Sequence, residues 1–185
     1  MKQEKYIAFL RGINVGGNHK LPMADLKKEI LNLGFRNPDT LLNSGNLVFE
    51  GRPEDPGLLE NRLSEHLKKV FGFPVPVLLR TSAEIMDLIT DNPFAGTTVT
   101  PDTRLYCSFL SVPTQVKPDL PWISSDGAFQ ILEVRDRTVC SVLNLQLNRT
   151  TKAMDGLEQL FGKTMTTRNY NTIQRIADKW LVPGP

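Results

Sequence analysis

Residues 6–33, YIAFLRGINVGGNHKLPMADLKKEILNL, contain the order of elements on which the predicted fold rests. The short apolar run 6–10 is typical of a buried strand. Apolar residues then recur every three or four positions between 23 and 33, which indicates an amphipathic helix. Pro22 suits the first turn of that helix and Gly34 suits its C-terminal cap. The stretch therefore predicts a strand, a loop rich in glycine and asparagine, and a helix.

The following residues predict three more strands and two more helices. Residues 40–49, TLLNSGNLVF, have β-forming halves around a polar centre, which fits either one bulged strand or a tight hairpin. We favour the hairpin because Ser-Gly flanked by asparagines is turn chemistry. Apolar spacing predicts a helix over 59–71 and an apolar run predicts a strand over 75–79. Thr81-Ser82-Ala83-Glu84 has the form of a capping box and should start a third helix.

A segment rich in proline and threonine separates these elements from a second set. Residues 91–102 contain two prolines and a glycine, and we interpret them as a linker. The second set comprises a strand over 105–111, a hairpin of 130–134 with 139–143, a helix over 153–161, a short strand over 164–167 and a final helix capped by Asn169.

The two sets resemble each other, and this similarity predicts the fold class. Phe71-Gly72 is followed by Arg80 and a helix, as Phe161-Gly162 is followed by Arg168 and a helix. The prediction is an α+β protein of two ferredoxin-like (β-α-β-β-α-β) halves, each followed by an extra helix. It requires residues 115–125 to stand where the first helix of the second half should be. The predicted domains are 1–92 and 103–185, with 93–102 as the linker.

Topology turns this fold into a prediction about function. A right-handed crossover makes the first two strands of such a half parallel, so the loop 11–20 and the turn 43–46 should lie at the same edge of the sheet. Glycines allow successive N–H groups to point at one anion, and a helix N-terminus adds partial positive charge. The residues expected to bind a ligand there are Arg11, Asn14, Gly16, Gly17, Asn18, Lys20, Asn43, Ser44 and Asn46.

Two further observations bear on this candidate. The glycines match neither the P-loop nor the Rossmann spacing, so no cofactor follows from them. Loops rich in glycine and asparagine also serve simply to turn the chain, and Asn46 could have only that role. A second candidate is 166–172, where Arg168 and Asn169 precede a helix; the alternative interpretation is a polar helix cap.

Three stretches resemble one family. AFLRGINVGGNHKLPMADLK (8–27), LLNSGNLVFEG (41–51) and TTRNYNTIQRIA (166–177) are similar, in the right order, to the bacterial domain-of-unknown-function family 1697. Tyr170 stands where that family more often has tryptophan. The resemblance implies an α+β fold of ferredoxin-like character, no assigned activity, and a special role for the three loops.

Composition and side-chain chemistry limit the partners. The net charge is +2, from 22 basic and 20 acidic residues, and no basic stripe typical of polyanion binders is present. Two cysteines and two histidines at these spacings predict no metal site. The apolar run 6–10 is too short for a signal or a membrane span, so we expect a cytoplasmic protein. His19 is the one loop residue with a near-neutral reference pKa.

These limits leave three hypotheses about function. The favoured one is a binding module for a phosphate-bearing ligand, either a nucleotide or single-stranded nucleic acid, at the loop after the first strand. The second is an enzyme acting on a phosphorylated small molecule. The third is an interaction scaffold whose polar loops are structural. Fold alone does not choose among them.

Overall fold

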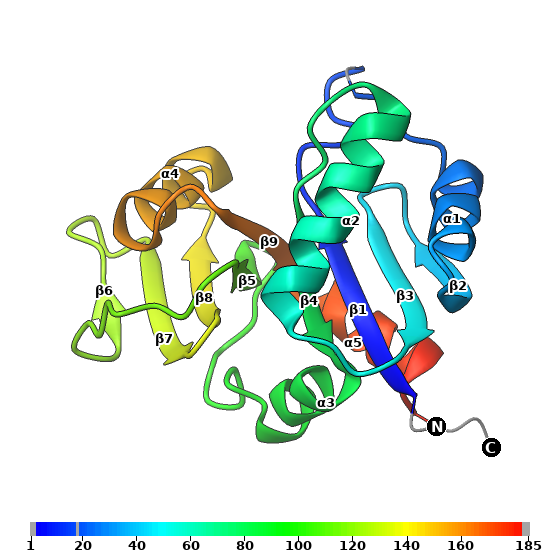
Figure 1. Ribbon diagram of the computed structural model, residues 1–185. Helices are drawn as coiled ribbons and strands as arrows, with labels where there is room; N and C mark the ends of the chain where they lie inside the picture. Colours follow the sequence, from blue (N-terminus) through cyan, green and yellow to red (C-terminus); the bar gives the residue numbers. More distant parts are fainter. Residues whose placement is uncertain (1–2, 18, 183–185) are drawn as a thin grey trace. The chain divides into compact units, whose positions relative to one another are not determined.

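The computed structural model describes residues 3–17 and 19–182 and contains two compact units (Figure 1). The first unit comprises the described chain up to Met86 together with its end from Trp180 on; the second comprises Asp87–Lys179. The division falls inside a helix, Ser82–Asp91, ahead of the linker predicted for 93–102. The predicted domain limits stay a prediction.

The first unit has the predicted β-α-β-β-α-β order. Its elements are β1 (Glu4–Leu10), α1 (Met23–Asn32), β2 (Arg36–Leu41), β3 (Asn46–Gly51), α2 (Pro56–Phe71) and β4 (Val77–Thr81), followed by α3 (Ser82–Asp91). The strands form an antiparallel sheet in the order β2-β3-β1-β4. The hairpin of β2 and β3 is confirmed, and its turn is residues 42–45.

Both α1 and α2 pack on one face of this sheet. Leu26 and Ile30 of α1 and Leu63 of α2 are fully buried, in one cluster with Ala8 and Phe49 of the strands. The apolar spacing of the helices therefore turns their stripes toward the alternate, inward-facing residues of β1 and β3. This packing holds the end of β1 and the start of α1 in a fixed relation.

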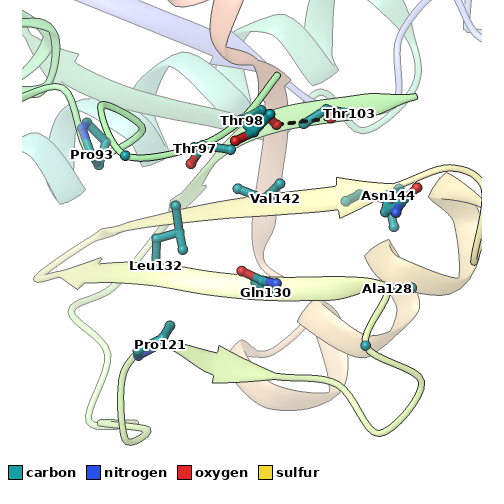
Figure 2. A pocket seen from close by; sticks show the side chains of 13 residues that line it. Pro93, Thr97, Thr98, Thr103, Pro121, Ala128, Gln130, Leu132, Val142 and Asn144 are labelled. Carbon is teal, nitrogen blue, oxygen red and sulfur yellow. Dashed lines mark hydrogen bonds between the residues drawn. The ribbon is translucent and has the colours of Figure 1, made fainter. Parts of the chain in front are cut away.

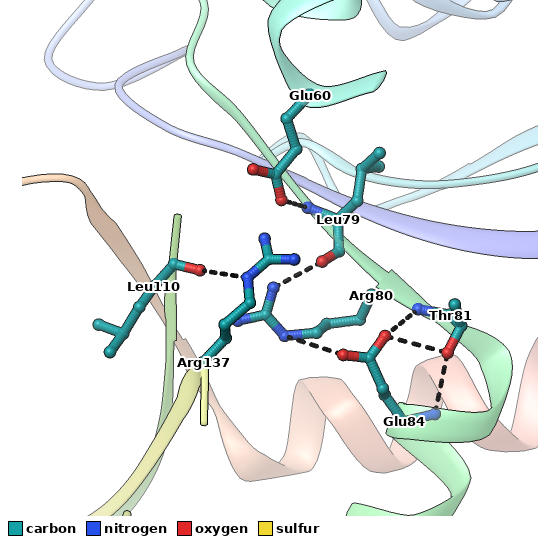
Figure 3. A network of polar contacts seen from close by, with 7 residues as sticks. All are labelled: Glu60, Leu79, Arg80, Thr81, Glu84, Leu110 and Arg137. Atoms are coloured by element: carbon teal, nitrogen blue, oxygen red, sulfur yellow. Dashed lines mark hydrogen bonds and ion pairs between the residues drawn. The ribbon is translucent and has the colours of Figure 1, made fainter. Parts of the chain in front are cut away.

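The edge strand β4 does not present free N–H groups to solvent. Alternate N–H groups of an edge strand point away from the sheet and invite another strand to pair with them. In β4 these groups are bound by side chains of α2 and α3, and Figure 3 shows the bonds to Glu60 and Glu84. The bonds run from Val77 N to Ser64 Oγ (3.0 Å), from Leu79 N to Glu60 Oε1 (2.7 Å) and from Thr81 N to Glu84 Oε2 (2.7 Å). Side chains thus replace a missing neighbouring strand.

The second unit is also α+β. Its elements are β5 (Thr103–Leu110), β6 (Trp122–Ile123), β7 (Phe129–Arg135), β8 (Thr138–Asn144), α4 (Thr150–Phe161), β9 (Met165–Asn169) and α5 (Tyr170–Trp180), whose last residue belongs to the first unit. The antiparallel strand order is β6-β7-β8-β5-β9. Apart from β6, this order repeats that of the first sheet.

One expected element does not form. Residues 115–125 contain no helix; they run irregularly and include only the two-residue strand β6. Pro118 and Pro121 explain this, because proline lacks the N–H that a helix interior needs and its ring clashes with the preceding turn. The fold class is α+β as predicted, but the second half has no counterpart of α1.

The predicted internal echo has a structural basis. Arg80 is the fourth residue of β4 and Arg168 is the fourth of β9. Each guanidinium donates from Nη1 to the carbonyl of the residue before it, Leu79 in one case and Thr167 in the other. Each strand is followed at once by a helix, α3 or α5. The two arginines therefore occupy equivalent positions in the two units.

In the second unit α4 covers one face of the sheet, where Ile131 and Leu143 pack against Leu157. Cys107 and Cys140 lie opposite each other on β5 and β8 and are fully buried free thiols. A hydrogen bond to Cys140 and burial raise the pKa of Cys107 well above its ordinary value, so it is not a reactive thiolate. Across the described residues, no helix is long and apolar enough to span a membrane.

Candidate functional site

The loop after β1 and the turn between β2 and β3 lie side by side, as the topology predicts. Leu10 N donates to Gly45 O at 2.8 Å, and Asn14 Nδ2 donates to Asn43 O at 2.8 Å. The register pairs Phe9 with Asn46, so the end of β1 meets the start of β3. The two segments richest in glycine and asparagine therefore share one edge of the first sheet.

Asn14 organises this edge. Its amide makes three hydrogen bonds to the main chain: Nδ2 donates to Leu21 O (3.0 Å) and Asn43 O, and Oδ1 accepts from Leu21 N (2.8 Å). Its φ of 55° lies in the left-handed region, which asparagine tolerates better than most residues. One side chain thus ties the loop to both the turn and the approach to α1.

A hollow of about 370 Å³ opens at this edge, at the start of α1. It is lined by Asn14, Gly17, Lys20, Leu21, Pro22, Met23 and Asn43. Four of these are residues that the sequence indicated for ligand binding, from two segments about 25 residues apart in the chain. The fold therefore gathers part of the predicted set around one cavity, which we call the α1 hollow.

The electrostatics of the α1 hollow favour an anion. Among the described residues that line it, the exposed Lys20 is the charged one. Pro22 is the N-cap of α1 and makes no side-chain hydrogen bond, so the first N–H groups of the helix have no capping side chain. Asp25 in the first turn provides a partly opposing negative charge. A cation beside an uncapped helix start is a suitable arrangement for a phosphate oxygen.

Other predicted residues of this edge lie outside the hollow lining. Arg11 is half-buried at the start of the loop, where its backbone N donates to Pro76 O at 2.9 Å. The Asn46 amide is fully buried and donates to Leu41 O and to Ser44 Oγ, so it holds the turn. Gly16 is exposed. Asn18 lies outside the described residues. Binding roles for these residues stay predictions.

The His19 side chain also makes its contacts outside the hollow. Its ring stacks on Phe73 with centroids 4.7 Å apart and planes 14° apart, and Nδ1 lies 3.1 Å from Gly12 O. It is not among the residues that line the α1 hollow. The imidazole is therefore placed as a packing group of the loop rather than as an acid or base facing the cavity.

The second candidate, Arg168 with Asn169, lies in the second unit. Arg168 Nη1 donates to Thr166 Oγ1 (2.8 Å) and to Thr167 O (3.0 Å), and burial lowers its pKa to about 10. Asn169 Oδ1 accepts from Asn171 N at 2.9 Å, so it caps α5 as the sequence predicted. Both side chains have structural bonds, and a ligand role for them stays a prediction.

Sequence reasoning missed a hollow of the second unit (Figure 2). It measures about 600 Å³ and lies between the segment 93–98 and strands β7 and β8, with Gln130, Leu132 and Val142 among its walls. Its lining includes no charged side chain. A phosphate placed there would be desolvated without a countercharge, so this cavity does not fit the predicted ligand. Thr97 and Thr98, in the segment interpreted as a linker, gave only a weak signal of it in the sequence.

No metal cluster accompanies these cavities. Within 3–17 and 19–182, no group of three or more His, Cys, Asp or Glu side chains is close enough to hold a metal ion. The site chemistry available at the α1 hollow is therefore that of a lysine ammonium, two asparagine amides and backbone N–H groups.

Fold and site define an α+β protein with two antiparallel sheets and a polar cavity at a strand-to-helix loop. The family model described as "Protein of unknown function (DUF1697)" matches residues 3–124, and the chain belongs to this family. No curated protein matches the sequence. A conserved bacterial protein of Streptococcus pneumoniae has a similar solved structure, with a TM-score of 0.72, 20% identity, and coverage of 96% of this chain and 98% of that one. At that identity the likeness concerns the fold.

Proposed function

We propose that the α1 hollow binds the phosphate group of a small molecule, with a nucleotide as the favoured class. The observation that supports this most is the convergence of Lys20, Asn14 and Asn43 on a cavity that adjoins an uncapped helix start. Anions are stabilised at helix N-termini because several N–H groups point at them and the macrodipole adds partial positive charge.

A pocketed ligand fits better than a long nucleic acid strand. The cavity of about 370 Å³ lies within the ordinary range for small-molecule sites. A strand of nucleic acid is held mainly by a row of lysines and arginines along its phosphates. The chain carries a net charge of only +2, and one cation lines this hollow.

An enzymatic role has less support. Catalysis of phosphoryl or acyl chemistry needs an acid, base or nucleophile within reach of the substrate. The α1 hollow is lined by no histidine, cysteine or carboxylate among the described residues. Binding without chemical turnover is therefore the simpler function for this cavity.

Thermal unfolding with matched ligands tests the proposal. Adenosine and AMP, or uridine and UMP, differ only by the phosphate, so a shift produced by the nucleotide alone reports phosphate recognition. A ligand at about 100 times its Kd adds about 2.7 kcal/mol of stability, which is roughly 5–10 °C for a chain of this size. We expect this shift to disappear in a Lys20→Gln/Asn43→Ala variant.

The variant leaves the contacts that hold the loop in place. The main-chain oxygen of Asn43 accepts the hydrogen bond from Asn14 Nδ2, so Asn43→Ala keeps the bond that holds the loop. Lys69→Gln removes an exposed charge on α2 away from the hollow and should retain the shift. An equal shift in all variants would place the ligand elsewhere. No shift with any nucleotide would overturn the proposal and favour an interaction scaffold.

A further inference from the structure

A second polar cavity lies in the first unit, at the opposite edge of the sheet from the α1 hollow. It measures about 550 Å³ and is lined by Gln3, Leu33, Gly34, Phe35, Arg36, Gly51, Arg52, Glu54 and Arg62. Arg36 starts β2, Gly51 ends β3 and Arg62 lies in α2, while the other residues lie before β1, between α1 and β2, and between β3 and α2. Three are arginines, and we call the cavity the arginine hollow after Arg36, Arg52 and Arg62.

The charge of this lining is out of balance. Three guanidinium groups face one carboxylate, Glu54, so the lining carries 3 − 1 = +2 charges. Glu54 is already paired with Arg62, at 2.9 Å between Oε1 and Nη2. Within residues 3–17 and 19–182, the side chains of Arg36 and Arg52 make no hydrogen bond or ion pair. Like charges gathered around one cavity repel each other, and a bound anion would relieve that repulsion.

The walls of the hollow are held in place by contacts of their own. The Tyr6 hydroxyl donates to Arg52 O (3.4 Å) and accepts from Glu54 N (3.0 Å), which fixes the backbone on both sides of residue 53. The Arg62 guanidinium lies over the Phe35 ring at 5.2 Å while it pairs with Glu54. A ligand therefore meets one oriented guanidinium and a fixed rim, which lowers the entropy lost on binding.

At the base of the hollow, Gly51 packs so closely on Phe35 that no larger residue fits at position 51. A Cβ built on Gly51 would lie 2.7 Å from Phe35 Cδ1 and 2.9 Å from Cε1. Phe35 is 5% exposed, so it fills the space beneath the cavity and cannot give way easily. Glycine at 51 thus lets β3 approach the Phe35 ring, over which the Arg62 guanidinium lies.

We propose that the arginine hollow binds a compact, multiply charged oxyanion, a ligand that presents two or more phosphate or carboxylate groups. The planar guanidinium fork matches these groups with two parallel hydrogen bonds, and three forks require more than one negative charge for balance. The cavity also has more volume than a single phosphate fills. This site is separate from the α1 hollow and does not depend on the function proposed there.

Calorimetric titration of the full chain with inorganic pyrophosphate and with citrate tests the proposal and separates the two ligand sources. We expect saturable binding of at least one of them at low salt. An Arg36→Gln/Arg52→Gln variant should weaken it at least about tenfold for each arginine, since hydrogen bonds between charged groups are worth about 1.5–3 kcal/mol. An Arg36→Lys/Arg52→Lys variant retains the charge but not the fork and should bind with intermediate affinity.

Two controls make the result specific to this cavity. Arg175→Gln removes an exposed arginine of α5 in the second unit and should bind as the wild type does. Lys20→Gln/Asn43→Ala impairs only the α1 hollow, so retention of binding in that variant separates this proposal from the function proposed above. Backbone amide resonances of Gly34 and Gly51 should shift on titration, whereas a site in the α1 hollow would shift Gly17.

Three outcomes would overturn the proposal. One is the absence of saturable binding of either anion to the wild type. Another is equal affinity in the Gln variant, with circular dichroism showing that it is folded. The third is a shift confined to Gly17 and its neighbours, which would assign the anion to the α1 hollow instead.

Discussion

Gly45 shows at the scale of one residue why the two polar segments can meet. It is buried in the turn between β2 and β3, its φ is +78°, and its carbonyl accepts from Leu10 N. A Cβ there would lie 2.7 Å from both Leu10 Cβ and Ile13 Cδ1. The absence of a side chain at this position lets the turn close on the loop after β1.

Gly72 provides a matched control for a prediction about Gly45. Both have a φ of +78°, but a Cβ on Gly72 would meet nothing within 4 Å. We expect Gly72→Ala to cost about 1–2 kcal/mol, the penalty of a left-handed conformation. Gly45→Ala should cost about 1–3 kcal/mol more, because the methyl group also overpacks the contact with Leu10. Urea unfolding measures both; equal losses would show that the close approach is unimportant.

At the scale of elements, the stability of the first unit depends on side chains that accept hydrogen bonds from the outward-facing N–H groups of the edge strand β4. Glu60 is 5% exposed and accepts from Leu79 N, a main-chain group that no strand pairs. Glu60→Ala leaves that N–H buried, so we expect a loss of about 2–3 kcal/mol in urea unfolding. Glu65→Ala changes an exposed glutamate of the same helix and should cost under about 0.5 kcal/mol. Similar losses in the two variants would show that the hydrogen bond from Leu79 N to Glu60 does not stabilise β4.

In the second unit, Asp126 joins the turn before β7 to the start of α4. Its carboxylate accepts from Ser124 Oγ (2.6 Å), from Ala128 N (3.1 Å) and from Asn148 Nδ2 (2.6 Å). The hydrogen bond from Ser124, followed by that from Ala128 N, lowers its pKa from 3.8 to about 2. A carboxylate with a lowered pKa stabilises the fold above the pKa of the unfolded chain.

The sign of this shift gives a pH prediction. The contribution of Asp126 is complete above about pH 4 and disappears as the pH falls through about 2. Wild type should therefore be more stable than Asp126→Asn at pH 7, and the difference should shrink between pH 4 and pH 2. Asp119→Asn alters a carboxylate with no hydrogen bond among the described residues and should follow the wild-type curve. A pH-independent gap between wild type and Asp126→Asn would refute the assignment.

At the scale of the whole molecule, the first unit is built from both ends of the chain. Trp180 Nε1 donates to Asp39 Oδ2 at 3.0 Å, and Lys5 Nζ donates to Trp180 O at 2.9 Å. The end of α5 is thus bonded to β2 and β1, although 141 positions separate Trp180 from Asp39. Trp180 is consequently part of the stability of the first unit.

A double-mutant cycle measures how much the hydrogen bond between Trp180 and Asp39 contributes to stability. Trp180→Phe retains an aromatic ring but loses the indole N–H. A hydrogen bond from such an N–H to a carboxylate contributes about 1.5–3 kcal/mol to stability. We expect Trp180→Phe and Asp39→Ala to show a coupling energy of at least about 1 kcal/mol in chemical unfolding. Trp122→Phe with Asp39→Ala should show none, because the Trp122 ring packs against Phe129 in the core of its own unit. Strictly additive effects of Trp180→Phe and Asp39→Ala would mean that the bond is not formed in solution.

The features that the sequence predicted correctly depend on a few neighbouring residues. The capping box at Thr81 forms as predicted, with Glu84 N donating to Thr81 Oγ1 and Glu84 Oε2 accepting from Thr81 N. The hairpin around Ser44-Gly45 was likewise predictable, because turn preferences belong to a few consecutive residues. The prediction that residues 115–125 replace a helix of the second half was wrong. The similarity of the two halves was given more weight than Pro118 and Pro121, which disfavour a helix.

The sequence by itself determined the α+β class, most helices and strands, and the placement of two polar segments at one sheet edge, because periodicity and crossover handedness are local or topological rules. Only the tertiary structure decided which side chains line a cavity. Lys20 and Asn43 do so, whereas the Asn46 amide turns inward to hold its turn. The arginine hollow likewise joins residues of β2, β3 and α2 with residues of the neighbouring loops. Such groupings depend on strand register and helix packing, which the whole core sets and no short stretch of sequence contains.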